Sequence, residues 1–392
     1  MVDSVGTCLE LAQRAIRFNI IIVGSSVLSE YSPYIALSSQ IRRSIVIGLH
    51  EGCSVEDIAR SIGASRDEVL SHLEFLREAG YVAERSSHLV PTFFIALREE
   101  VTRVKELVKR LGVELAKRYE SSWDLVVETY HKLSVSSRFS FDRVAFVLVG
   151  AYSLDVYMLE KFAEEGRLMP RAPRRRAGSF YMWGIEGGAN ALGKCGMHSD
   201  RAGEYGFATF GCEEERKRKA PPDHLSEVLL GLMNERDLTN AFTRLIRFPS
   251  SEKERIFKEI EEATSRILRE YERRYYDSKY KLSSEAKEYL KKWMYVDEDL
   301  TPLAPIYTKE DLDTIKDFTD KIAIHAFDVV YENLDRIESA FKECKVSEYA
   351  DFAEFFCWFY HLLFSETLDY LVAKQRLKSP VHGYEYWVWR ET

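Results

Sequence analysis

Residues 54–82 (SVEDIARSIGASRDEVLSHLEFLREAGYV) constrain the fold of this chain more than any other stretch. Apolar residues recur every three or four positions in two short runs, which is typical of two helices that each bury one face. Between the runs, residues 63–65 (Gly-Ala-Ser) predict a tight turn, and Gly80 stands where a helix ends in a left-handed C-cap. The stretch therefore predicts two packed helices joined by a turn.

A hairpin is predicted directly after these helices, with strands at residues 81–85 and 88–93 around Ser86-Ser87, and a further helix precedes them from residue 39. In this order of elements, residues 39–97 resemble the winged helix-turn-helix regulators of the arsenic-repressor and multiple-antibiotic-resistance (ArsR/MarR) types. The resemblance covers roughly 60 of the 392 residues. It implies a DNA-binding transcriptional regulator.

In that family the third helix enters the major groove of double-stranded DNA with its N-terminal half. The resemblance implies that the outward residues of this helix contact DNA, namely Ser65, Arg66, Glu68, Ser71 and His72. The wing tip would offer Arg85, Ser87 and His88, beside Ser86, to the DNA backbone or the minor groove.

The charge of this segment leaves a second role open. Residues 39–97 contain six arginines, no lysine and eight acidic residues, and the whole chain has a net charge of −8. Non-specific binding to DNA phosphates depends on an excess of basic residues. Some enzymes, small-molecule O-methyltransferases among them, use a similar winged helix only to dimerise. A methyltransferase is disfavoured here, because no large domain of alternating strands and helices follows.

The rest of the chain predicts a mainly α protein with a small α/β part. Apolar runs predict a central three-stranded segment with strands at 143–149, 180–185 and 205–210, and the region after residue 221 has helical periodicity. The expected domains are an N-terminal extension (1–38), the winged helix (39–97), linker or dimerisation helices (98–140), the small α/β domain (141–221) and a C-terminal helical domain (222–392) that serves as a sensor or assembly region.

A coiled-coil seam is predicted within the linker helices. Five apolar residues follow one another at alternating spacings of three and four: Val101, Val104, Val108, Leu111 and Leu115. This spacing favours packing within the chain or a homodimer, and the sequence does not choose between them.

The Gly-rich segment 184–196 indicates an alternative function. In this alternative, the protein is an enzyme or binds nucleotides or anions through this segment. Residues 188–195 (GANALGKC) nearly match a phosphate-binding loop, in which Lys194 would reach the phosphates. Cys195 replaces the hydroxyl that binds magnesium. Cys195, His198 and Cys212 could instead hold zinc, but a structural zinc site usually needs four ligands. We therefore expect no metal, no cofactor and no catalytic residue.

Arginines cluster just before this segment. Arg171, Arg174, Arg175 and Arg176, together with Lys194, are candidates for anion binding, or they lie on a solvated surface loop. Arginine suits the first of these roles, because its planar guanidinium binds phosphate through two hydrogen bonds.

Six widely spaced cysteines are typical of a reducing compartment, and no apolar run approaches the roughly 18–20 residues that cross a membrane. These features predict a cytoplasmic protein without a membrane partner. Residues 18–28 are expected to be a buried helix or strand rather than a signal sequence. A small-molecule effector is expected for the C-terminal region.

Overall fold

In the computed structural model, residues 8, 10–188, 191, 193, 195–212 and 224–390 are described. They are mostly helical and include three β-sheets, which confirms a mainly α chain with smaller sheet-containing parts. The chain divides into two compact units. The first comprises Met1–Glu114, Met158–Lys194 and Phe327–Thr367, and the second comprises Leu115–Tyr157, Cys195–Ala326 and Leu368–Thr392. Each unit thus combines three separate stretches, whereas the sequence suggested five consecutive domains.

The first unit contains the three helices and the hairpin that the sequence predicted. These elements are α4 (Gln40–Glu51), α5 (Val55–Ile62), α6 (Arg66–Ala79), β2 (Val82–Arg85) and β3 (His88–Pro91). Ser54 and Ser65 cap α5 and α6 by accepting backbone hydrogen bonds, and Gly63 and Gly80 end these helices with positive φ. The predicted turn and C-cap are therefore confirmed, since glycine adopts this conformation at little cost.

Gly48 allows α4 to lie close to α5. A Cβ atom at this position would lie 2.6 Å from Cγ1 of Ile58 on α5 and 3.1 Å from Cδ1 of Leu11. Leu11 belongs to α2 (Leu11–Arg17), which packs on α4 and α5. These three helices and α6 thus share one core, in which Leu11, Val46, Ile58 and Val69 are buried.

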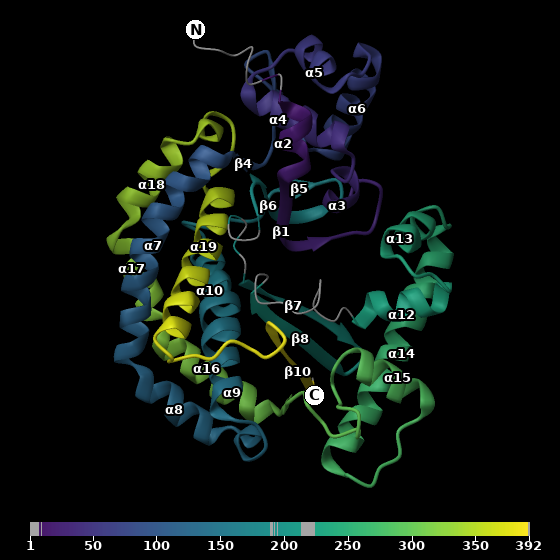
Figure 1. The fold of residues 1–392 in the computed structure, drawn as a ribbon, viewed down its shortest axis with the longest axis vertical. Coiled ribbons are helices and arrows are strands. Elements are labelled where there is room, and N and C mark those ends of the chain that lie inside the picture. Colours follow the sequence, from purple (N-terminus) through teal and green to yellow (C-terminus); the bar gives the residue numbers. More distant parts are fainter. Residues whose placement is uncertain are drawn as a thin grey trace. The chain divides into compact units, whose positions relative to one another are not determined.

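The first unit also contains a sheet with β6 (Gly178–Glu186) at its centre (Figure 1). On one side β1 (Phe18–Ser26) pairs with β6 in antiparallel fashion, and on the other β4 (Phe94–Ala96) pairs with it in parallel. The short strand β5 (Arg174–Arg175) also pairs with β6. The strand predicted at 180–185 is confirmed. The expectation of a buried helix or strand at 18–28 holds only in part, because β1 is a strand in which Phe18 alone is buried.

Helices complete the first unit, and α10 (Met158–Glu165) packs against α19 (Phe352–Ala373) (Figure 1). The ring of Phe162 lies 5.0 Å from that of Phe356 and 5.1 Å from that of Tyr360. The remaining helices of this unit are α3 (Pro33–Ala36), α18 (Leu334–Lys342), the 3-10 helix η4 (Lys345–Glu348) and parts of α7 (Arg98–Ser121) and α17 (Ile324–Glu332).

The apolar seam of α7 is buried within the chain. Each of its five residues, from Val101 to Leu115, is at most 6% exposed. The seam therefore packs inside a single copy of the protein and no longer supports a homodimer.

The second unit has a sheet of four strands in the order β7 (Cys195–Ala202), β8 (Tyr205–Cys212), β10 (Tyr384–Arg390) and β9 (Ile306–Tyr307). The strand predicted at 205–210 lies in β8 and is confirmed. In contrast, β9 and β10 fall in the region that the sequence assigned to helices alone. This part of the prediction was wrong, because pairing with a distant strand leaves no signal in local periodicity.

The strand predicted at 143–149 was also wrong. Residues Phe141–Phe146 form α9, and Val147–Tyr157 form a π-helix, η2. A short continuous apolar run fits a buried helix as well as a buried strand. Here Gly150 allows η2 to approach β8, because a Cβ atom would lie 2.3 Å from Cε1 of Phe210. Since β6 and β8 belong to different sheets, the described residues do not form the predicted three-stranded central segment.

The other elements of the second unit are helical: α8 (Trp123–Lys132), η1 (Ser134–Ser137), α12 (His224–Met233), α13 (Leu238–Ile246), α14 (Ser250–Tyr276), α15 (Ser284–Lys292) and α16 (Lys309–Ile322). Thr308 and Asp311 form a capping box at the start of α16, where the sequence has this spacing.

A buried ion pair joins four elements of the first unit. Nη2 of Arg175 lies 2.8 Å from Oε1 of Glu354, and the two side chains are 2% and 1% exposed. The Glu354 carboxylate also accepts hydrogen bonds from the backbone N–H groups of Phe94 and Met182. Arg175 donates further to the carbonyl oxygens of Phe180 and Thr92. The pair therefore fixes α19 against β4, β5 and β6.

We expect Glu354→Ala to lower the free energy of unfolding by about 3–5 kcal/mol, because it leaves a buried guanidinium without its counter-charge. Chemical denaturation followed by circular dichroism measures this. The matched control is Glu259→Ala, which removes an exposed partner of Arg255 and should cost about 0–1 kcal/mol. Equal losses in both variants would contradict the role given to the buried pair.

Candidate functional site

The first candidate surface is the N-terminal half of α6. Ser65 accepts a hydrogen bond from the N–H of Glu68, so its hydroxyl caps the helix. The side chains of Arg66, Glu68 and Ser71 are exposed. Nε of Arg66 lies 2.8 Å from Oε1 of Glu56, in a pair whose side chains are 60% and 57% exposed. Ser65 is exposed as well, so four of the five predicted residues are accessible, and Arg66 has a solvent-exposed partner.

His72 is held more tightly than its neighbours. Nε of Arg42 donates to Nδ1 of His72 at 3.4 Å, and the guanidinium of Arg42 lies 4.0 Å from the ring centre of Phe75. Partial burial, reinforced by the charge of Arg42, lowers the pKa of His72. The imidazole is therefore a neutral, half-buried group that braces α6 against α4, and only part of it faces solvent.

The hairpin tip is the second exposed part of this surface. Ser86 and Ser87 both have positive φ, as the central residues of a type I′ turn require. Arg85 pairs across the strands with His88, and all four residues are exposed. Among the described residues, Arg85 has no ion-pair partner. The tip therefore presents a free guanidinium and an imidazole beside two small hydroxyl groups.

The predicted anion-binding residues differ in their exposure and in their ion-pair partners. Arg171 and Arg174 are exposed, whereas Arg175 is buried in the pair with Glu354 and is therefore not available to an anion at the surface. Arg176 pairs with Glu78 on the last turn of α6 and lies 3.9 Å from the ring centre of Tyr31. Lys194 lies outside the described residues.

In its described residues, the Gly-rich segment departs from a phosphate-binding loop. Such a loop leads into a helix, but Cys195 begins strand β7. Before it, Ala191 accepts a hydrogen bond from Nε1 of Trp358, and a Cβ atom at Gly193 would lie 2.6 Å from Cβ of His361. The described part of the segment is therefore packed on α19.

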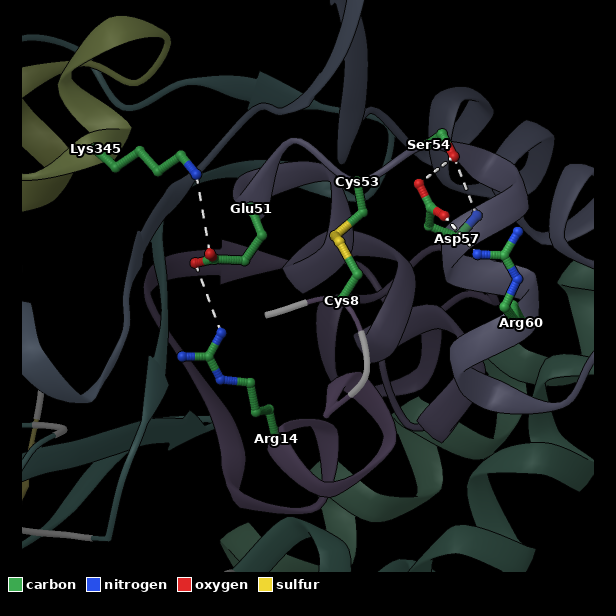
Figure 2. Close-up of a disulfide and its surroundings, with 8 residues drawn as sticks. All are labelled: Cys8, Arg14, Glu51, Cys53, Ser54, Asp57, Arg60 and Lys345. Atoms are coloured by element: carbon green, nitrogen blue, oxygen red, sulfur yellow. Dashed lines mark hydrogen bonds and ion pairs between the residues drawn. A yellow bond between two sulfur atoms is a disulfide. The ribbon is translucent and has the colours of Figure 1, made fainter. Parts of the chain in front are cut away.

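Two disulfides were not predicted. Cys195 bonds to Cys212 where β7 and β8 pair, so neither sulfur is a thiolate that could bind zinc. Cys8 bonds to Cys53 at the junction between α4 and α5 (Figure 2). Four of the six cysteines are thus paired, and their spacing no longer favours a reducing compartment.

The Cys8–Cys53 disulfide adjoins the start of α5. Cys53 immediately precedes Ser54, whose hydroxyl accepts the N–H of Asp57, and Asp57 pairs with Arg60 (Figure 2). On the other side of Cys53, Glu51 lies between two basic residues. Its Oε1 lies 3.7 Å from Nη1 of Arg14, and its Oε2 lies 3.9 Å from Nζ of Lys345. The bond therefore fixes the chain between α4 and α5, both of which pack against α6.

A buried polar cluster lies beside Glu51. Nδ1 of His50 lies 2.5 Å from the hydroxyl of Tyr349, while Nε2 lies 3.9 Å from Glu100 and has no hydrogen-bond partner among the described residues. Burial lowers the pKa of His50 to about 3 and raises that of Glu100. His50 is therefore neutral at pH 7, and its role is to connect α4 with the chain that precedes α19. No sequence motif marked this cluster.

Comparison of the chain with protein-family models, with curated proteins and with solved structures found no match. Among the described residues, no helix combines the length and the hydropathy needed to span a membrane.

We expect that alkylation of the denatured, unreduced protein labels only Cys344 and Cys357, the two cysteines that form no disulfide, and that reduction exposes all six. Mass spectrometry of peptides checks the pairing. Because a cross-link restricts the unfolded chain, removing the 45-residue Cys8–Cys53 link by Cys8→Ser and Cys53→Ser should cost about 4 kcal/mol. Labelling of Cys53 without reductant would contradict this pairing.

Proposed function

We propose that residues 39–97 form a winged helix-turn-helix and that the protein is a transcriptional regulator that binds double-stranded DNA. The observation that carries this proposal is the arrangement of α4, α5, α6 and the hairpin, with the first half of α6 and the hairpin tip both exposed. In such modules α6 would be the recognition helix and the hairpin would be the wing.

The first turn of α6 is suited to reading base pairs. Arg66 can bind guanine through two hydrogen bonds, Glu68 can accept one from cytosine, and Ser71 can bind either partner. Arg66 must first leave Glu56. An exposed ion pair is worth about 0–1 kcal/mol, whereas a good arginine–base contact is worth about 1–3 kcal/mol. The exchange is therefore favourable. The positive end of the helix dipole adds to the attraction for phosphate.

The exposed arginines near β5 supply positive charge that residues 39–97 lack. The ion pair between Arg176 and Glu78 holds this loop at the last turn of α6. Since α6 has 14 residues, its two ends lie about 20 Å apart. Arg171 and Arg174 would therefore contact the DNA backbone beside the site that α6 reads, rather than its bases.

The acidic balance of residues 39–97 favours the second candidate, in which this segment contacts a protein or mediates a homodimer. Glu74, Glu78 and Glu84 are exposed together with the acids at the start of α6. Such a dimer would need a surface other than the buried seam of α7. A cytoplasmic location belongs to the proposal for a regulator, although the two disulfides would be unusual in most reducing compartments.

We expect selection from a random DNA pool at about 0.1 M salt to enrich one motif, and Arg66→Ala to relax the preference at one base pair by about 1–3 kcal/mol. The double variant Arg171→Ala, Arg174→Ala should weaken binding to all sequences alike and reduce the slope of log K against log salt by about 0.9 per lost phosphate contact. Fluorescence anisotropy across a salt series measures both.

Arg255→Ala is the matched control, because Arg255 is 59% exposed and ion-paired like Arg66 but belongs to the second unit. It should leave the selected motif unchanged. If no motif is enriched, and the Arg66 variant behaves like the parent, residues 39–97 act as a protein-contact module and the second candidate replaces the first.

A further inference from the structure

A pocket in the second unit is lined by acidic, basic and apolar side chains. It has a volume of about 330 Å³, within the range of small-molecule sites. Its wall comes from the start of α9, the turn before β10 and β10 itself. The charged side chains that line it are Asp142, Arg143, Lys378 and Glu385. Two are acidic and two are basic, so the lining carries both charges without an excess of either.

Glu385 is the fixed element of this wall. Its side chain is 8% exposed, and Oε2 accepts hydrogen bonds from both Nε and Nη2 of Arg143, at 2.9 and 2.6 Å. The other carboxylate oxygen, Oε1, has no hydrogen-bond partner among the described residues. Because both hydrogen bonds from Arg143 reach Oε2, Oε1 can accept a hydrogen bond from a donor that enters the pocket.

Arg143 is only partly used by the protein. Besides its bonds to Glu385, Nη1 donates to the carbonyl oxygen of Leu303. A guanidinium has five N–H donors, and three are engaged, so two remain. Lys378 pairs with Asp142 at 3.2 Å, but these side chains are 75% and 49% exposed. Because an exposed pair of this kind is weak, Lys378 can turn to a ligand at little cost.

The pocket also has an apolar side. Leu303, Pro380 and Val381 line it, and the side chain of Val381 is 70% exposed. A ligand that covers Val381 would gain by removing apolar surface from water. The pocket therefore offers one acceptor, a pair of cationic groups and an apolar wall.

We propose that this pocket binds a small α-amino acid with an apolar side chain. The ammonium group donates to Oε1 of Glu385, the carboxylate lies against Lys378 and the spare N–H groups of Arg143, and the side chain covers Val381. A zwitterion matches this lining, because its ammonium and carboxylate groups can each meet a lining group of opposite charge, whereas a simple anion or cation uses one kind of group only. Binding can be measured without DNA, so this inference stands apart from the proposed function.

The test is isothermal titration of the full-length protein with leucine, N-acetylleucine and leucinamide. We expect leucine to bind, and both analogues to bind roughly tenfold more weakly or worse, since each lacks one charged hydrogen-bonding group. Equal binding of N-acetylleucine, or no heat from leucine at millimolar concentrations, would overturn the proposal.

Two variants assign the contacts. Glu385→Gln should weaken leucine binding by about tenfold or more, whereas Glu298→Gln should leave it unchanged, because Glu298 is 92% exposed, pairs with Lys291 and does not line the pocket. Lys378→Ala should reduce the preference for leucine over leucinamide. It also keeps the test decisive if Glu385→Gln fails to fold, since Lys378 is exposed. If Lys378→Ala prefers leucine over leucinamide as strongly as the parent does, Lys378 does not contact the carboxylate, and the proposed binding mode is wrong.

Discussion

The ion pair of Arg175 with Glu354 is the interaction on which the first unit depends. A carboxylate that is 1% exposed would be too costly to bury alone. It is tolerated here because a guanidinium and two backbone N–H groups surround it. Those donors come from strands that are distant in sequence. The pair thus specifies which strands meet at the start of α19, in addition to any stability that it contributes.

Placement of Arg175 also decides how the neighbouring arginines can act. With one guanidinium taken into the core, β5 is fixed on β6, and the flanking residues are directed outward. Arg176 reaches Glu78 and Tyr31, while Arg171 and Arg174 remain exposed. A run of basic residues that looks uniform in sequence therefore contains a structural cation, a surface ion pair and two accessible charges.

Local patterns were read well from the sequence, and long-range pairing was not. Helices α4 to α6, the hairpin and the glycine C-caps follow from spacing within a few residues. Strand β1 was left open as helix or strand, because its partner β6 lies about 160 residues later. The run at 143–149 was misassigned since burial on all sides removes periodicity. At the candidate site, Arg66 and Arg85 could be predicted to be exposed, but the Glu56 partner, the disulfide beside Ser54 and the pocket at Glu385 arise from tertiary contacts.

The position of β6 between β1 and β4 has a consequence for synthesis. Both outer strands are complete once the ribosome has passed Ala96, but the strand that joins them ends at Glu186. At about 5–20 residues per second, the nascent chain carries two unpaired strands for several seconds. Unpaired strand edges invite pairing with other chains. The helical core around Gly48 can form during this interval. It would keep β1 and β4 close to folded helices until β6, the strand that pairs with both, has been synthesised.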